Sequence, residues 1–160
     1  MNILNQDIEF LEENRDCSYF DEKLSDIRYR YLSSCPTSLY QEFLDRGWRR
    51  FGRMHFVPEC KSCTKCVSMR IDVANYKFSK SEKRVIAKNK DTKLYIRQPS
   101  VTMEHLNLYE KYHRFMNDKK DWPYSPIDVD DYIRSYVEGK EEYAKEFLYM
   151  RDDKLIGVAL

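Results

Sequence analysis

Apolar and polar residues alternate along several short stretches in the first half of the chain, and this pattern predicts β-strands. Ile27–Leu32 alternates most strictly, so one face of this strand is expected to be buried. Trp48–Val57 and Val67–Val73 also have the composition of strands, and Pro58 follows the first of them. The early segment Ile8–Leu11 is short but compatible with a strand.

Capping residues predict two helices in the same half. Thr37–Arg46 follows a proline and stops at Gly47, a residue that suits the left-handed position after a helix. Ser79 and Glu82 have the spacing of a capping box, in which each side chain binds the other residue's backbone N–H. They predict a short basic helix that ends near Asn89.

The second half of the chain has a clearer helical pattern. Lys93–Arg97 alternates like a strand, whereas Thr102–Met116 has apolar residues at helical spacing and predicts an amphipathic helix. Asp128–Glu138 predicts an acidic helix that a glycine ends. Lys145–Met150 and Leu155–Leu160 predict a β-hairpin.

The hairpin's last strand, Leu155–Leu160, is the most apolar run of the chain. A strand buried on both faces needs neighbours that cover it. We therefore expect the natural protein to continue beyond Leu160.

These elements predict a mixed α+β or α/β protein. A chain of 160 residues is long enough for one ordinary domain or two small ones. The character of the sequence changes near residues 90–92, so we predict two domains, residues 1–91 and 92–160.

The composition is that of a globular protein, with 42% hydrophobic and 34% charged residues. No apolar run approaches the length that crosses a membrane, and the first residues lack the regions of a signal peptide. We expect a cytoplasmic protein with reduced thiols and no membrane partner.

Positive charge is concentrated in the middle of the chain. Thirteen Lys or Arg and three Asp or Glu fall between Arg46 and Lys90, whereas the net charge of the whole chain is +1. Aromatic residues are interleaved, and this combination favours a nucleic acid, whose phosphates bind guanidinium groups and whose bases stack on rings. The alternative is a half-buried hairpin with a solvated charged face. We assign anion contacts to Arg49, Arg50, Arg70 and Arg84.

Three cysteines inside the basic stretch have the spacing of metal ligands. Cys60, Cys63 and Cys66 form C-x2-C-x2-C, and both a zinc site and an iron–sulfur cluster need a fourth ligand. The candidates for that ligand are, in order, Cys17, Cys35 and His55. We predict a site made by Cys17, Cys60, Cys63 and Cys66. The alternative is reduced cysteines packed as small apolar side chains.

No residues stand out as catalytic. The sequence has no Ser/His/Asp order, phosphate-binding glycine loop or paired-carboxylate motif, so no nucleotide cofactor is expected. His113 lies at helical spacing from Tyr109 and is a candidate base, although a histidine on a helix is more often structural. The catalytic residue is left unassigned.

Four ordered motifs run through residues 17–90: Cys17-Ser-Tyr, Gly47-Trp-Arg-Arg-Phe-Gly, the three cysteines between Pro58 and Ile71, and Phe78–Arg84. In this order they resemble the arginyl-tRNA–protein transferase family, above all its bacterial branch, the aspartate/glutamate leucyltransferases. The resemblance implies a small cysteine-bearing N-terminal α+β domain, followed by the first half of an acetyltransferase-like domain.

The same resemblance implies an aminoacyltransferase. Such enzymes move Leu or Arg from charged tRNA to the α-amine of a protein beginning with Asp or Glu, in the N-degron pathway of protein degradation. The implied partners are aminoacyl-tRNA and those proteins. The four arginines, Arg49, Arg50, Arg70 and Arg84, would then contact either tRNA phosphates or the acidic residue of the protein substrate. The aminoacyl ester is already activated, so the enzyme mainly holds ester and amine together and helps to remove a proton.

Two other functions stay open. The basic stretch and the cysteines would suffice for a metal-stabilised RNA-binding module without catalysis. A small-molecule acetyltransferase has the least support, because the sequence lacks the pyrophosphate-binding turn and the helix that follows it.

Overall fold

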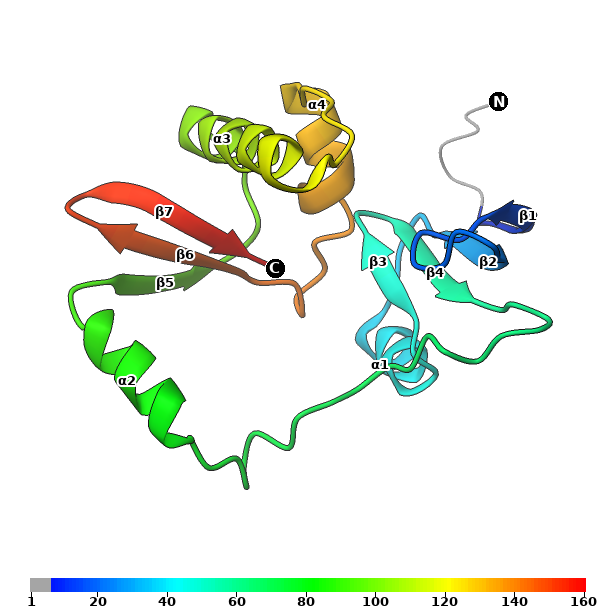
Figure 1. Ribbon diagram of the computed structural model, residues 1–160, viewed down its shortest axis with the longest axis horizontal. Helices are drawn as coiled ribbons and strands as arrows, with labels where there is room; N and C mark the ends of the chain where they lie inside the picture. The colour runs from blue at the N-terminus through cyan, green and yellow to red at the C-terminus, as the bar shows by residue number, and fades with distance from the viewer. Residues whose placement is uncertain (1–6) are drawn as a thin grey trace. The chain divides into compact units, whose positions relative to one another are not determined.

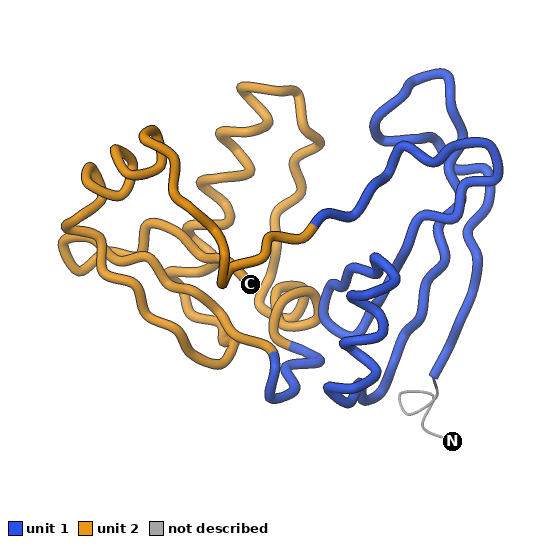
Figure 2. Tube along the Cα trace, turned by 90° about the horizontal axis from the view of Figure 1, so that it is seen from below, with its two compact units in different colours: residues 1–69, 138–143 blue, residues 70–137, 144–160 orange. Residues whose placement is uncertain are grey.

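The computed structural model describes residues 7–160, which pack as two compact units (Figure 2). Unit 1 extends to Met69 and also includes Glu138–Tyr143. Unit 2 comprises Arg70–Val137 and Ala144–Leu160. Among the described residues, no helix has the length and apolar character needed to cross a membrane.

Unit 1 consists of one sheet and one helix, which are β1 (Ile8–Asp16), β2 (Leu24–Tyr31), β3 (Arg49–Phe51), β4 (Met54–Pro58) and α1 (Thr37–Asp45). The four strands are antiparallel and lie in the order β1-β2-β4-β3 (Figure 1). The hairpin between β3 and β4 turns at Gly52, whose φ of 55° is a left-handed value that favours glycine.

The core of unit 1 lies between α1 and one face of this sheet. Phe43 of α1 is buried together with Leu32 and Cys35. Its ring centroid lies 4.9 Å from that of Trp48 and 5.1 Å from that of His55. The helix predicted over residues 37–46 is confirmed, and Leu39, Tyr40 and Phe43 on one side of it pack in this core.

Unit 2 contains three strands and four helical segments, which are β5 (Lys93–Arg97), β6 (Glu146–Arg151), β7 (Lys154–Ala159), α2 (Lys80–Lys88), α3 (Met103–Lys120), α4 (Val129–Tyr132) and the π-helix η2 (Ile133–Val137). The strands form an antiparallel sheet in the order β5-β6-β7. Helix α3 lies over one face of this sheet (Figure 1). The predicted hairpin of β6 and β7 is confirmed.

Side-chain caps fix where the helices of unit 2 begin. The hydroxyl of Ser79 accepts the backbone N–H of Glu82 at 3.3 Å, and the Glu82 carboxylate accepts the N–H of Ser79 at 2.7 Å. The predicted capping box is therefore confirmed. Thr102 caps α3 by accepting the N–H of His105 at 3.5 Å, and Asp128 caps α4 in the same way.

The predicted strand over Val67–Val73 is wrong. This segment has no regular secondary structure, and the side chains of Val67, Met69 and Val73 are 70%, 91% and 82% exposed. Alternation gives a segment two different faces, but a strand also needs a neighbour whose backbone groups pair with its own. No strand within residues 7–160 pairs with it.

Two further predictions need correction. Trp48–Val57 is not one strand but the β3–β4 hairpin. The acidic helix predicted over Asp128–Glu138 is one turn of α-helix followed by η2. The α+β class is confirmed by the two antiparallel sheets and their helices. The packing units divide the chain after Met69, and the predicted domains 1–91 and 92–160 stay a prediction.

Candidate functional site

The sheet of unit 1 brings two of the predicted metal-binding segments to the same end. Cys17 directly follows β1, and Cys60 comes two residues after β4. Because β1 and β4 both pair antiparallel with β2, their C-terminal ends lie beside its N-terminal end. There the carbonyl of Asp26 accepts the N–H of Glu59 at 2.8 Å and lies 3.9 Å from Sγ of Cys60.

The sulfur atoms do not converge on one point. In the part of the chain that is described, no group of three or more His, Cys, Asp or Glu side chains is placed to hold a metal ion. A tetrahedral zinc site needs four ligands within about 2.0–2.3 Å of one ion. Cys17, Cys60 and Cys63 are partly exposed, Cys66 is exposed, and Cys35 is buried in the core of unit 1. As folded here, these residues do not fit the predicted metal or cluster.

The neighbouring arginines Arg49 and Arg50 differ in their surroundings. Arg49 is exposed on β3. Arg50 donates from Nη1 to the carbonyls of Gly52 and Gly139, at 3.0 and 3.2 Å. Its guanidinium also lies over the ring of Tyr40, 5.7 Å from the centroid. Arg50 therefore fixes the segment 138–143 within unit 1, and this contact engages the group predicted to bind an anion.

The other two predicted anion-binding arginines belong to unit 2. Arg70 lies in the segment before α2, and Arg84 lies on α2; both side chains are exposed. Nε of Arg84 donates to the carbonyl of Lys80 at 3.4 Å. The four arginines are thus divided between the units, and their proposed role in binding anions stays a prediction.

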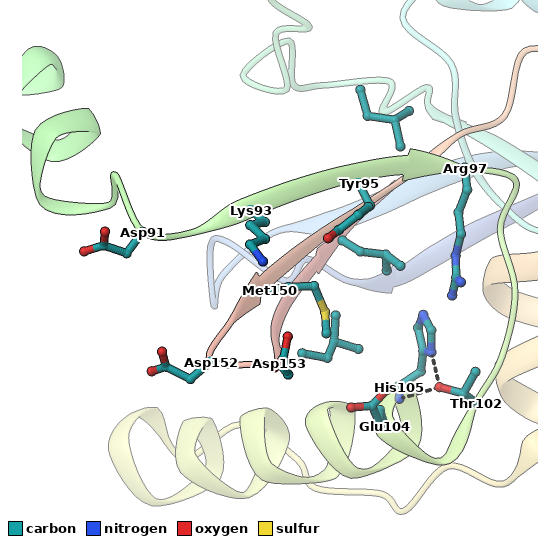
Figure 3. A pocket seen from close by; sticks show the side chains of 13 residues that line it. Asp91, Lys93, Tyr95, Arg97, Thr102, Glu104, His105, Met150, Asp152 and Asp153 are labelled. Atoms are coloured by element: carbon teal, nitrogen blue, oxygen red, sulfur yellow. Dashed lines mark hydrogen bonds between the residues drawn. The ribbon is translucent and has the colours of Figure 1, made fainter.

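Unit 2 contains a cleft of about 640 Å³ that the sheet and the start of α3 line (Figure 3). The acidic residues Asp91, Asp152 and Asp153 lie at one end, beside the β6–β7 turn. Arg97 and His105 lie at the other end. Lys93 also lies toward the acidic end, and Glu104 lies beside His105, so the cleft has charges of both signs along β5, with three carboxylates at one end and Arg97 at the other. Its volume is typical of small-molecule sites.

A buried carboxylate supports the Arg97 end of the cleft. Glu146 is 1% exposed, although isolated carboxylates are rarely buried. Its Oε1 accepts from Nε of Arg97 at 2.6 Å and from the hydroxyl of Ser100 at 3.0 Å. Nη2 of Arg97 donates to the same hydroxyl at 2.9 Å. These bonds follow from register, because Arg97 and Glu146 are directly paired residues of β5 and β6.

His105 lies in the wall of the same cleft and is 2% exposed. Its Nδ1 is 2.7 Å from the hydroxyl of Thr102. Its Nε2 lies 3.4 Å from Oε2 of Glu146, but it forms no hydrogen bond with any described residue. Burial raises the pKa of the neighbouring Tyr132 to about 12, and the charge of Glu146 acts in the same direction. One oxygen of Glu146 faces the imidazole of His105, and the other binds the guanidinium of Arg97. This end of the cleft therefore places an imidazole near a fixed guanidinium.

Sequence reasoning missed Arg97, His105 and Glu146. Arg97 and Glu146 are 49 residues apart, and only strand pairing brings them together. The one local signal was Thr102 three residues before His105, which is the spacing of an N-cap. The candidate base His113 instead stacks on Tyr109, with ring centroids 4.0 Å apart.

Similarity to known proteins identifies the class. Residues 15–84 match the family described as "Arginine-tRNA-protein transferase, N terminus". This range includes the cysteine-bearing end of unit 1 and extends into α2.

Relatives extend the similarity over nearly the whole chain. An aspartate/glutamate leucyltransferase of Helicobacter hepaticus is 41% identical over 153 residues, and one of Campylobacter jejuni is 43% identical over 154 residues; each alignment covers 96% of this chain. One from Saccharophagus degradans is 30% identical over 164 residues, which is 67% of its length. The chain belongs to the arginyl-tRNA–protein transferase family, in the branch of the aspartate/glutamate leucyltransferases. It spans 64% of the length of the first two relatives.

Proposed function

We propose that this protein transfers leucine from leucyl-tRNA to the α-amine of proteins that begin with Asp or Glu. The observation that carries the proposal is the identity of 41–43% with aspartate/glutamate leucyltransferases across 96% of the chain. The corresponding role is in the N-degron pathway of the cytoplasm. Arginine is the alternative amino acid, because the family description names arginine-tRNA.

The proposed reaction exchanges an ester for an amide. The acceptor's α-amine attacks the carbonyl carbon of the leucyl ester and forms a C–N bond. The bond between that carbon and the tRNA 3′-terminal oxygen then breaks. The amine loses a proton, and the released tRNA hydroxyl gains one. Holding the two reactants together can supply much of the acceleration without a covalent enzyme intermediate.

The acceptor's N-terminus is proposed to bind in the cleft of unit 2. An N-terminal Asp or Glu carries a carboxylate on its side chain. The side chain of Arg97 is 47% exposed, and its guanidinium is held by Glu146. The three carboxylates toward the far end of the cleft outnumber Lys93 there and favour a positive charge, so the cleft is proposed to orient a substrate that carries both charges. His105, in the wall at the Arg97 end, is the proposed group for steering the amine's proton.

Transfer of radiolabelled leucine to an Asp-initiated peptide tests this assignment. We expect Arg97→Lys to lower kcat/KM for this peptide by about tenfold, because an ammonium lacks the planar fork of guanidinium. The matched control is Lys111→Gln, an exposed cation of α3 outside the cleft. The longer Campylobacter jejuni relative is assayed in parallel, as the positive control for the transfer reaction. Equal kcat/KM for wild type and Arg97→Lys would remove Arg97 from the acceptor site.

We further propose that Cys17, Cys60, Cys63 and Cys66 bind one zinc ion or iron–sulfur cluster, which requires a different arrangement of their sulfur atoms from the one described above. The support is their spacing and their common end of the sheet. No step of the transfer depends on it. Elemental analysis and visible absorbance of protein purified without air decide the matter. The absence of metal and of absorbance would leave the cysteines as free thiols.

The sheet of unit 2 is proposed to belong to an acetyltransferase-like domain, as the family resemblance implies. Its three antiparallel strands and the helix over one face are compatible with that assignment. Arg49, Arg70 and Arg84 are proposed to contact tRNA phosphates, because all three are exposed in the basic stretch. Such contacts weaken as salt concentration rises.

A further inference from the structure

One face of the unit 1 sheet carries a continuous row of aromatic side chains, one from each strand. We call Phe10, Tyr29, Phe56 and Phe51 the aromatic row. Phe10 pairs with Tyr29, and Tyr29 pairs with Phe56, so these side chains share a face. Neighbouring ring centroids are 5.0 Å, 6.3 Å and 5.7 Å apart along the row.

The row lies on the sheet face opposite α1. Helix α1 packs on the other face, where Phe43 and Tyr40 contact His55. Phe10 and Phe51, which end the row, are 45% and 55% exposed, and Ile8 beside Phe10 is 45% exposed. Tyr29 and Phe56, in the middle of the row, are half-buried. A continuous apolar surface that is exposed at both ends is a feature of binding sites rather than of ordinary protein surface.

Cations border the row on the same face. Arg49 of β3 is paired with Phe56, and its side chain forms no ion pair within residues 7–160. Nη1 of Arg15 donates to the hydroxyl of Tyr29 at 3.0 Å, but it also pairs with the carboxylate of Glu12 at 3.1 Å, and that carboxylate accepts the Tyr29 hydroxyl at 3.2 Å. A row of rings with an exposed guanidinium at its edge matches unpaired nucleotides, whose bases stack on rings while their phosphates bind cations.

We propose that the aromatic row binds a single-stranded segment of RNA by base stacking, with Arg49 contacting its phosphates. The inference rests on the proposed function only for the identity of that RNA, the unpaired part of a charged tRNA. Charge selects this occupant over a second copy of the chain, because two such faces would bring the Arg49 side chains of both copies into one apolar interface. A duplex is disfavoured because its bases are already stacked.

Fluorescence anisotropy with a fluorescein-labelled single-stranded RNA oligonucleotide tests the inference without any transfer reaction. We expect Phe10→Ala to raise Kd by about 5- to 150-fold, the loss typical of one base-stacking ring. Phe10→Trp should keep the affinity, and its fluorescence should be quenched by RNA. Arg49→Gln should weaken binding and reduce the slope of log Kd against log salt by about 0.7.

The matched control is Phe115→Ala, which removes a ring of similar exposure, 56%, from α3 of unit 2. It should leave Kd unchanged. Thermal unfolding shows whether each variant is folded. If Phe10→Ala is not folded, quenching of the Phe10→Trp fluorescence by RNA still tests the inference. The inference is overturned by an unchanged Kd in Phe10→Ala, by an equal loss in Phe115→Ala, or by equal affinity for a duplex of the same sequence. Self-association that Phe10→Ala abolishes without changing RNA affinity would overturn it too.

The two proposals can fail separately. If no amino acid is transferred but RNA binding depends on Phe10, the proposed function falls and the inference about the row stands. If transfer occurs and the Phe10→Ala protein binds the oligonucleotide normally, the inference falls and the proposed function stands.

Discussion

Each unit buries one histidine almost completely, but the surroundings of the two histidines differ in kind. His55 of unit 1 and His105 of unit 2 are both 2% exposed. The rings of Phe43 and Tyr40 surround His55, which identifies it as part of an apolar core. His105 instead lies 3.4 Å from the carboxylate of Glu146, in the wall of a cleft. Equal burial thus marks packing in one unit and a candidate site in the other.

The largest effect is expected in the apolar core of unit 1. Phe43→Ala should lower the free energy of unfolding by about 3–5 kcal/mol, because it removes a buried ring that neighbouring side chains cannot fully replace. Urea denaturation measures this change. Phe115→Ala, at an exposed position of α3, should change stability by less than about 0.5 kcal/mol. A loss below 1 kcal/mol in Phe43→Ala would show that this core does not hold unit 1 together.

A smaller effect is expected at the polar centre of unit 2. Glu146→Ala should cost about 2–4 kcal/mol, since it leaves Arg97 and Ser100 without their shared acceptor. Arg97 is partly exposed and can turn to water, which limits the loss. Asp118→Ala on the exposed surface of α3 is the control for urea denaturation. If both variants unfold at the same urea concentration, Glu146 does not stabilise the fold.

The pair Arg49 and Arg50 separates a structural arginine from an exposed one. Arg50→Lys should cost about 1–2 kcal/mol of stability, because an ammonium cannot bridge the carbonyls of Gly52 and Gly139 in the same way. Arg49→Lys should change stability by less than about 0.5 kcal/mol. Calorimetric unfolding of both variants compares them directly. Equal losses would contradict the role assigned to Arg50.

The smallest effect concerns pH and His55. Burial lowers the pKa of His55 from 6.5, and the nearby charges of Arg50 and Arg30 act in the same direction. The unfolded chain therefore binds a proton first as pH falls, so stability is full above pH 6.5 and declines below it. The decline is at most about 1.4 kcal/mol per pH unit.

Thermal unfolding at pH 7.5 and 5.5 measures that decline. The difference in Tm between these two pH values should be smaller in His55→Phe than in wild type, whatever the variant's absolute stability. An identical pH dependence in the two proteins would mean that His55 does not titrate as described.

Local sequence patterns predicted the elements whose causes are local. The capping box of Ser79 and Glu82 and the strand signal of Ile27–Leu32 each lie within a few residues, and both elements were confirmed. The buried face expected for this strand was not found, because residues 27–31 are all half-buried. The alternation of Val67–Val73 was misleading, because pairing depends on a partner strand that alternation cannot reveal.

Long-range contacts account for what sequence reasoning missed. Arg50 meets the carbonyl of Gly139, 89 residues later in the chain. Arg97 and Glu146 meet through the register of β5 and β6. The aromatic row likewise depends on the pairing of four strands. Charge counting found the basic stretch, but it could not assign each arginine to packing or to binding.

The most direct test of the proposed function is the product of the reaction. Leucyl-tRNA and arginyl-tRNA are supplied together, with one peptide beginning with Asp and a second beginning with Ala. Tandem mass spectrometry then reads which amino acid is added and at which nitrogen. We predict one leucine on the α-amine of the Asp peptide and none on the Ala peptide. No addition to the Asp peptide, or equal addition to both, would contradict the proposed function.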